Sequence, residues 1–171
     1  MVRHLTAAQH ADEYTRPPTI DDRDPAAALS AAVAEVLTVA ETWLGWDGRP
    51  IYRDGNAWTP HKALRRVADH MIDHLAEMEC RLAGLPTVPN QWHGRMVTSA
   101  ADLAQFTEID LDEATSRIIR LDACYRARLT GLDSGALDAR PAEATWTLRE
   151  IVHHVAEINY YGQVIGDLSR R

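Results

Sequence analysis

The chain lacks a surplus of positive charge. Its 25 Asp and Glu residues outnumber its 18 Lys and Arg residues, so the formal net charge is −7 and the sequence pI is about 5.6. Non-specific binding to nucleic acid depends on basic surface that displaces phosphate counterions. The composition therefore argues against a nucleic-acid partner. Lys62 is the only lysine, and this preference for arginine is typical of a GC-rich genome.

Long apolar runs and cysteines are also scarce. We find no run that approaches the roughly 18 apolar residues of a membrane-spanning helix, and residues 1–19 lack the apolar core of a secretory signal. We therefore expect a cytoplasmic protein with no membrane partner. The two cysteines, Cys80 and Cys124, lie in separate helix-like runs, so buried free thiols are expected rather than a disulfide.

A length of 171 residues suits one domain with a single core. Residues 1–23 are predicted to be a flexible lead-in, because Pro17-Pro18 and Asp21-Asp22 oppose regular structure there. The domain itself is predicted to span residues 24–171.

Most of the chain lacks strand-like alternation, and its apolar residues recur at helical spacing. Long helices are predicted from capping residues to terminating signals at 24–45, 59–84, 110–131 and 147–168. The third would open on a capping box over residues 110–113. Between them lie 47–57, with a short hairpin, the long connection 85–107 with a helical turn near 100–106, and a loop at 132–144. This order predicts an all-α four-helix bundle with long inter-helix connections.

The second and fourth predicted helices begin with matching phrases, Trp58-Thr59-Pro60 and Trp146-Thr147-Leu148. Histidines follow in both helices, which suggests one site built between them. The two tryptophans are expected to pack at the helix entries, because large aromatic side chains dominate cores. Trp92 lies in the long connection, and connections of this length often line sites.

The candidate ligands are spaced one helical turn apart. Glu150 and His154 project together from the edge of the apolar face of the fourth helix, whereas His153 is expected to face solvent. His70 and His74 have the same spacing beside the apolar stripe of the second helix. Facing helices of a bundle hold metal ions in this way. Three histidines and one carboxylate would suit Zn²⁺, Ni²⁺ or a similar ion.

Each of these residues also has a structural interpretation. Glu150 stands three residues after Thr147, so its carboxylate could cap the helix instead of binding a metal. His70 and His74 lie among acidic residues and could belong to a solvated face. His154 could be a hydrogen-bonded core residue.

Two segments of the chain resemble the DinB-like superfamily. WTLREIVHHVAEINYY (residues 146–161) resembles its last helix, and WTPHKALRRVADHMIDHLAEME (residues 58–79) resembles its second. The resemblance covers roughly residues 25–168. It implies a four-helix bundle with a three-residue metal site near one end. The superfamily includes mycothiol-dependent maleylpyruvate isomerases, bacillithiol transferases and proteins described as metal-dependent hydrolases.

The ligand pattern implied by the resemblance is matched only in part. Isomerase-like members use a histidine of the second helix with a Glu-x-x-x-His pair of the fourth, and Glu150 and His154 match that pair. The second-helix ligand commonly falls eight residues after the tryptophan, where this chain has Arg66, which is expected to be the more exposed residue. Arginine stays protonated and cannot bind a metal. Either His70, with or without His74, replaces that ligand, or the metal is lost and Arg66 pairs with Glu150.

We therefore predict a metal-dependent enzyme acting on a small-molecule substrate. It would be a hydrolase, or a transferase or isomerase that uses a low-molecular-weight thiol, with its site between the second and fourth helices. A bound ion with an open coordination position could lower the pKa of water or hold a thiolate. The resemblance and the arginine-rich composition favour mycothiol as that thiol.

The alternative prediction is a metal-free DinB-like protein with a degenerate metal site. Such a protein would bind a small ligand or use a helix face for dimerisation. For either function a homodimer is the expected form of self-association, because twofold dimers are the commonest soluble oligomers.

Overall fold

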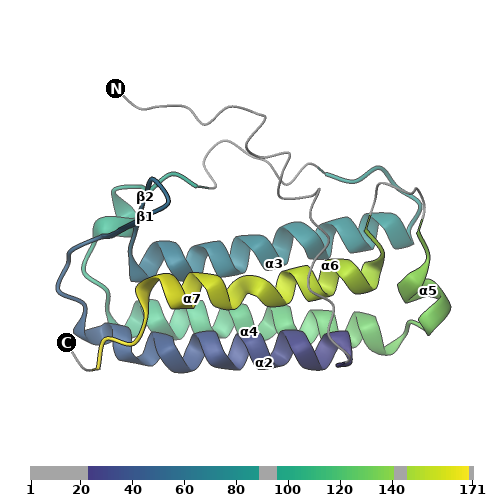
Figure 1. Ribbon diagram of the computed structural model, residues 1–171, viewed down its shortest axis with the longest axis horizontal. Helices are drawn as coiled ribbons and strands as arrows, with labels where there is room; N and C mark the ends of the chain where they lie inside the picture. The colour runs from purple at the N-terminus through teal and green to yellow at the C-terminus, as the bar shows by residue number, and fades with distance from the viewer. Residues whose placement is uncertain (1–22, 89–95, 141–145, 170–171) are drawn as a thin grey trace.

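The described part of the chain, residues 23–88, 96–140 and 146–169 of a computed structural model, is mostly helical (Figure 1). The long helical segments are α2 (Pro25–Ala40), α3 (Pro60–Leu82), α4 (Glu108–Thr130) and the pair α6 (Leu148–Val155) and α7 (Asn159–Ile165). A short 3₁₀ segment, Ala156–Ile158, joins α6 to α7. The predicted all-α class is confirmed.

The long helices lie side by side along the length of the molecule (Figure 1). α2 and α3 each contact α4 on one side and α6 and α7 on the other. The core between them is apolar and includes Met71, Tyr125, Ile151 and Ile158, each fully buried. α3 is therefore placed so that one of its faces meets α4 and another meets α6 and α7.

The helix starts follow local capping chemistry. The Asp24 carboxylate accepts hydrogen bonds from the amides of Ala26 and Ala27 at 3.0 and 3.1 Å, and Pro25 occupies the first turn of α2. The Thr59 hydroxyl accepts one from the Lys62 amide at 3.2 Å. Gly84 ends α3 with a positive φ of 66°. These boundaries are as predicted.

Other boundaries differ from the prediction. α4 begins at Glu108, because Thr107 and Asp110 form its capping box in place of one at residues 110–113. The last helix ends at Ile165 rather than near residue 168, because Gly166 leaves the helical region with a φ of 73°. The predicted loop at 132–144 contains the one-turn helix α5 (Ser134–Asp138), which is capped by Asp133.

Short elements fill the connections. The predicted hairpin is present as β1 (Ile51–Arg53) and β2 (Asn56–Trp58), which pair antiparallel with Ile51 opposite Trp58. A short 3₁₀ helix, Glu41–Gly45, continues α2. The predicted helical turn near residues 100–106 is the 3₁₀ segment Ala101–Leu103. The predicted lead-in and the connection around Trp92 lie outside the described residues, apart from Arg23 and the ends of the connection.

Two expectations about burial were wrong. Cys124 is exposed and Cys80 is half-buried, although both thiols are free. His153 is only 3% exposed, although its helical position predicted a solvent-facing side chain. A turn of helix at the edge of an apolar face becomes buried when neighbouring segments cover it, and spacing along one helix does not reveal that cover.

The expected absence of a long apolar segment also needs correction. By length and composition the segment Pro25–Gly45 would suffice to cross a membrane. In the folded chain this helix packs against α4, α6 and α7, and Leu29, Val33 and Val36 are buried. A helix in a protein core has the same composition.

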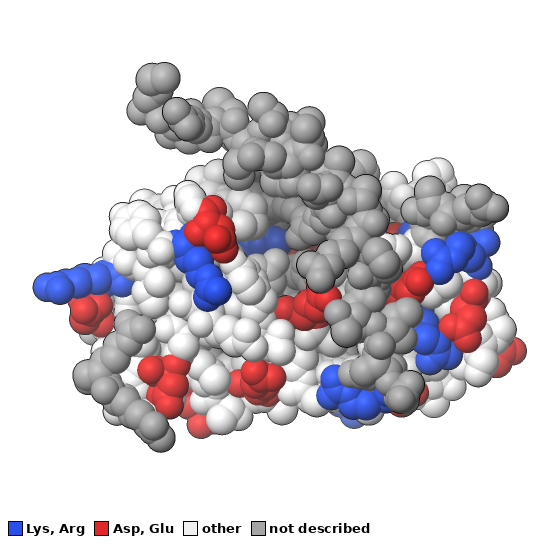
Figure 2. All heavy atoms as spheres, viewed as in Figure 1, with Lys and Arg blue, Asp and Glu red and all other residues white. Residues whose placement is uncertain are grey.

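Acidic and basic side chains are interspersed on the face of the molecule shown in Figure 2.

Candidate metal centre

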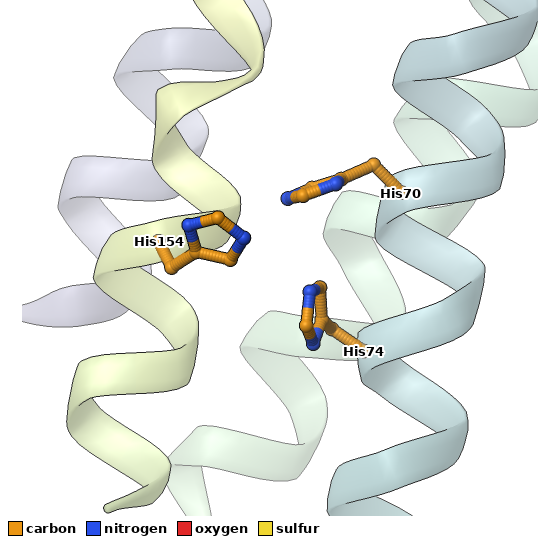
Figure 3. Close-up of side chains that lie close together, drawn as sticks. All are labelled: His70, His74 and His154. Carbon is orange, nitrogen blue, oxygen red and sulfur yellow. The ribbon is translucent and has the colours of Figure 1, made fainter. Parts of the chain in front are cut away.

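Three buried histidines meet between α3 and α6. His70 and His74 extend from α3, and His154 extends toward them from α6 (Figure 3). One ring nitrogen from each lies within 4.8 Å of the others, and the residues are 8%, 1% and 8% exposed. We call these residues the histidine cluster. The sequence named all three as candidate ligands, and the fold brings them together.

Helix geometry places the cluster. His70 and His74 are one turn apart, so their side chains share a face of α3. That face meets α6 and α7. The third imidazole, that of His154, comes from α6. The ring centroids of His70 and His154 are 4.7 Å apart, and those of His74 and His154 are 5.1 Å apart. The Trp146 ring packs 4.7 Å from His154, which is a structural role near a helix entry as predicted.

Carboxylates orient two of the three imidazoles. The Nδ1 atom of His74 lies 2.9 Å from Glu77 Oε2, and that of His154 lies 3.1 Å from Glu157 Oε2. When Nδ1 donates its proton to a carboxylate, the lone pair of Nε2 is left to bind an ion. This carboxylate–histidine arrangement is common around protein-bound zinc. The donor set therefore fits a divalent ion.

Glu77 is itself held in the ionised form. Burial alone would raise the pKa of its carboxyl group, but the hydrogen bond and charge of His74, together with Arg81, keep that pKa below its usual value. Arg81 pairs with Glu77 and also donates a hydrogen bond to the Trp146 carbonyl at 2.6 Å. This arginine therefore links α3 to the chain entering α6, next to the cluster.

Glu150, the fourth predicted ligand, is not brought into the cluster. Its carboxylate accepts a hydrogen bond from the Thr147 amide at 2.6 Å, which completes a capping box at the start of α6. Arg140 donates to both of its oxygens, at 2.7 and 2.8 Å. Burial opposes ionisation, but the Thr147 amide and Arg140 keep the pKa of Glu150 lowered. The structural interpretation of this residue is the one the fold realises.

Arg66 is the site residue whose placement the sequence misjudged. It is 1% exposed, not solvated, and within the described residues its hydrogen bonds are to Asp69 and Tyr161 rather than to Glu150. Its guanidinium lies over the ring of Tyr161, 5.6 Å from the centroid. The spacing of Arg66 and His70, one turn apart, could have indicated a shared face. Its burial depends on α7, which no local pattern reveals.

A separate hollow lies on the face of α3 that meets α4. It measures about 210 Å³ and includes His61, Arg65 and Asp102 in its lining. The His61 ring packs edge-on against Phe106, with centroids 5.0 Å apart. Arg65 donates to both oxygens of Asp102, at 3.1 and 2.9 Å. The charges of this hollow are therefore largely paired with one another.

Three imidazoles on a four-coordinate ion leave one position for water or substrate, which is the usual arrangement of catalytic zinc sites.

Comparison of the chain with protein-family models, with curated proteins and with solved structures returned no match.

Proposed function

We propose that this protein is a metal-dependent enzyme in which His70, His74 and His154 hold one divalent ion. The observation that supports the proposal is the convergence of three buried ring nitrogens within 4.8 Å. Buried imidazoles that were only core residues would gain little from facing one another. An ion would use all three lone pairs together. Imidazole ligands suit Zn²⁺ or Ni²⁺.

The reaction class follows from the open coordination position. A bound ion there would lower the pKa of water for hydrolysis or hold a thiolate for transfer or isomerisation. The resemblance of residues 58–79 and 146–161 to DinB-like proteins supports a four-helix bundle of that type and the thiol-dependent chemistry. A mycothiol-type thiol, a cytoplasmic location and a homodimer are parts of this proposal that rest on sequence alone.

The proposed ligand set differs from the one the resemblance implies. Both second-helix ligands come from His70 and His74, one and two turns beyond Arg66, and the fourth helix contributes His154 alone. The Glu150 carboxylate is already bonded to Thr147 and Arg140. The proposed site therefore takes two ligands from α3 and one from α6. The resemblance implies the opposite division, with one ligand from the second helix and two from the fourth.

Metal content tests the proposal directly. Untagged protein purified without chelators and reconstituted with Zn²⁺ is expected to hold about one ion per chain, as three-ligand sites do. His154→Ala should lose the ion, measured by inductively coupled plasma mass spectrometry. His153→Ala is the matched control, because His153 is also buried in α6 but lies outside the cluster. Equal metal in wild type and His154→Ala would contradict the proposal.

A metal-free small-ligand-binding or dimerisation protein is the second candidate. The observation that favours it is the buried cation of Arg66, which stands where the resembled family has a ligand and would repel an ion nearby. Under this alternative, wild-type protein would hold neither Zn²⁺ nor Ni²⁺ after reconstitution. Substitution of the cluster histidines would then change stability but not metal content.

A further inference from the structure

Arg66 is a buried cation with few close partners. Its side chain is 2% exposed, and its ion pair within the described residues is with Asp69, at 3.5 Å. Its other hydrogen bond within the described residues, to the Tyr161 hydroxyl, measures 3.4 Å. Both lie beyond the usual range of about 2.7–3.2 Å for N–H···O bonds. The Nε–H group has no hydrogen-bond partner among the described residues.

Such a guanidinium is costly unless something binds it. A buried charge without close hydrogen bonds loses its hydration and gains little in return. The neighbouring Arg65 shows what a satisfied arginine looks like in this helix, with both oxygens of Asp102 at 3.1 and 2.9 Å. Among the described residues the carboxylate paired with Arg66 is Asp69, at 3.5 Å, and Glu150 is bonded to Arg140.

The unsatisfied donors surround Tyr161, next to the histidine cluster. The Tyr161 ring lies 5.6 Å from the Arg66 guanidinium and 6.2 Å from the His70 ring. Trp58 packs against the same tyrosine at 5.7 Å, and its buried Nε1–H also lacks a hydrogen-bond partner among the described residues. The Arg66 and Trp58 side chains, each with a buried N–H group, and the histidine cluster thus lie around the Tyr161 ring, and Tyr161 itself contributes a hydroxyl.

We propose that Arg66, assisted by the Tyr161 hydroxyl, binds the carboxylate of a small anionic substrate beside the histidine cluster. The planar fork of a guanidinium matches a carboxylate with two parallel hydrogen bonds. A carboxylate brings a single negative charge, which one guanidinium neutralises. A doubly charged phosphate would leave an excess of negative charge close to Asp69.

This inference rests on the proposed function, because the substrate would lie between Arg66 and the ion of the cluster. Arg66 and His70 are one turn apart on α3, so a molecule held by Arg66 would present its remaining atoms to the cluster. Arg66 is thereby assigned a role in selecting and orienting substrate. Arg66 stands where the resembled family has a metal ligand, and under this proposal it determines substrate specificity instead.

Acetate is the probe for the experiment. Binding of acetate to Zn²⁺-loaded protein is measured by isothermal titration calorimetry for wild type, Arg66→Gln and the matched control Arg65→Gln. We expect Arg66→Gln to weaken binding about 10- to 100-fold, the range for loss of a charged hydrogen-bonding group. Arg65→Gln should weaken binding less than Arg66→Gln does, because Arg65 is linked to Arg66 indirectly, through Asp69, whose Oδ2 atom lies 3.5 Å from both guanidinium groups.

A spectroscopic measurement covers the case in which Arg66→Gln does not fold. In wild-type protein the ¹H–¹⁵N resonance of the Arg66 Nε–H group, assigned by its absence in Arg66→Lys, should move downfield on addition of acetate. Inorganic phosphate is titrated in parallel. Tighter binding of phosphate than of acetate would overturn the assignment to a carboxylate.

The outcomes separate this inference from the proposed function. If the ion binds but acetate affinity is equal in Arg66→Gln, or the Arg66 resonance does not move, the carboxylate site is overturned and the metal centre stands. If wild type binds no ion, the proposed function is overturned, and acetate is titrated into the metal-free protein. Binding lost in Arg66→Gln would then support the carboxylate site alone, and absence of binding would overturn it too.

Discussion

Helix α3 presents two polar faces that differ in how their charges are satisfied. On the face toward α4, Arg65 is bound by both oxygens of Asp102, and the Ser99 amide binds the same carboxylate at 2.7 Å. On the face toward α6 and α7, Arg66 is more deeply buried, and its polar contacts within the described residues are 3.5 Å to Asp69 and 3.4 Å to Tyr161. The two arginines are neighbours in sequence and both lie 3.5 Å from Asp69, yet among the described residues Arg65 also binds a second carboxylate, Asp102, at short distance, and Arg66 does not.

The difference teaches where to look for ligands. Burial raises the pKa of Asp102, but the hydrogen bonds and charge of Arg65 and the bonds from Ser99 outweigh it and keep that pKa low, as in a structural ion pair. The face with Arg66, His70 and His74 instead gathers a guanidinium whose hydrogen bonds within the described residues are 3.4 and 3.5 Å long and imidazoles that converge on one point. An unfinished polar network in a core is more consistent with binding than with stability.

Removal of a cluster histidine should have the largest effect. His74→Ala is expected to reduce Zn²⁺ affinity by more than about 100-fold, which exceeds the range for outer-shell changes. Competition with a chromogenic chelator measures this affinity. His61→Ala, on the opposite face of α3, is the control and should retain the wild-type value. A similar loss in both variants would show that the two faces do not differ in metal binding.

Removal of an orienting carboxylate should have the next largest effect. Glu157→Gln is expected to weaken Zn²⁺ binding about 10-fold, the lower end of the range for such groups, because Glu157 is half exposed. Its amide oxygen can still accept from His154 but without charge. The same chelator competition applies, with Glu79→Gln on α3 as control. Unchanged affinity would mean that Glu157 does not fix the His154 ring for metal binding.

The two arginines should differ in their effect on stability. Arg65→Met is expected to lower the free energy of unfolding by about 1–3 kcal/mol, because it leaves the buried Asp102 carboxylate without its charged partner. Arg66→Met should change it by less than about 1 kcal/mol in metal-free protein, since replacing a poorly paired buried charge by an apolar side chain is often neutral. Urea unfolding of both variants measures the difference. Equal destabilisation would remove the contrast between the faces.

The last expected effect is a pH dependence of stability from Lys62, which lies near the start of α3. Its ammonium donates to the Met96 carbonyl and the Thr98 hydroxyl at 2.7 and 2.9 Å and lies over the Trp58 ring. Burial, aided by the charge of Arg65, lowers the pKa of Lys62 from 10.5 to about 8. Between these values the unfolded chain binds a proton that the folded protein has released, so the free energy of unfolding should rise with pH.

The test for Lys62 is a difference measurement, because tyrosines titrate in the same range. Urea unfolding of wild type and Lys62→Met is compared across pH 8 to 10.5, the interval between the two pKa values. The wild type should gain stability relative to the variant over this interval, and the difference should be constant below it. Parallel stability curves throughout would contradict the lowered pKa.

Much of the fold could be predicted because its signals are local. Asp24 and Thr59 cap the helices that follow them through bonds within three residues, and helical spacing of apolar residues marks the buried stripes. The cluster histidines were also found locally, since i and i+4 spacing places His70 and His74 on one face. Such features depend on residues within a helical turn of one another, so they can be recognised from the sequence alone.

The sequence by itself therefore determined the helical class, most of the helix starts and the three histidines as candidates. Only the tertiary structure decided that Glu150 belongs to a cap closed by Arg140, and that Arg66 is buried against Tyr161. Tyr161 lies on α7, far along the chain from Arg66. Whether a polar residue is solvated, paired or poised for a ligand depends on what distant segments bring to it, because burial and charge pairing are set by packing between helices.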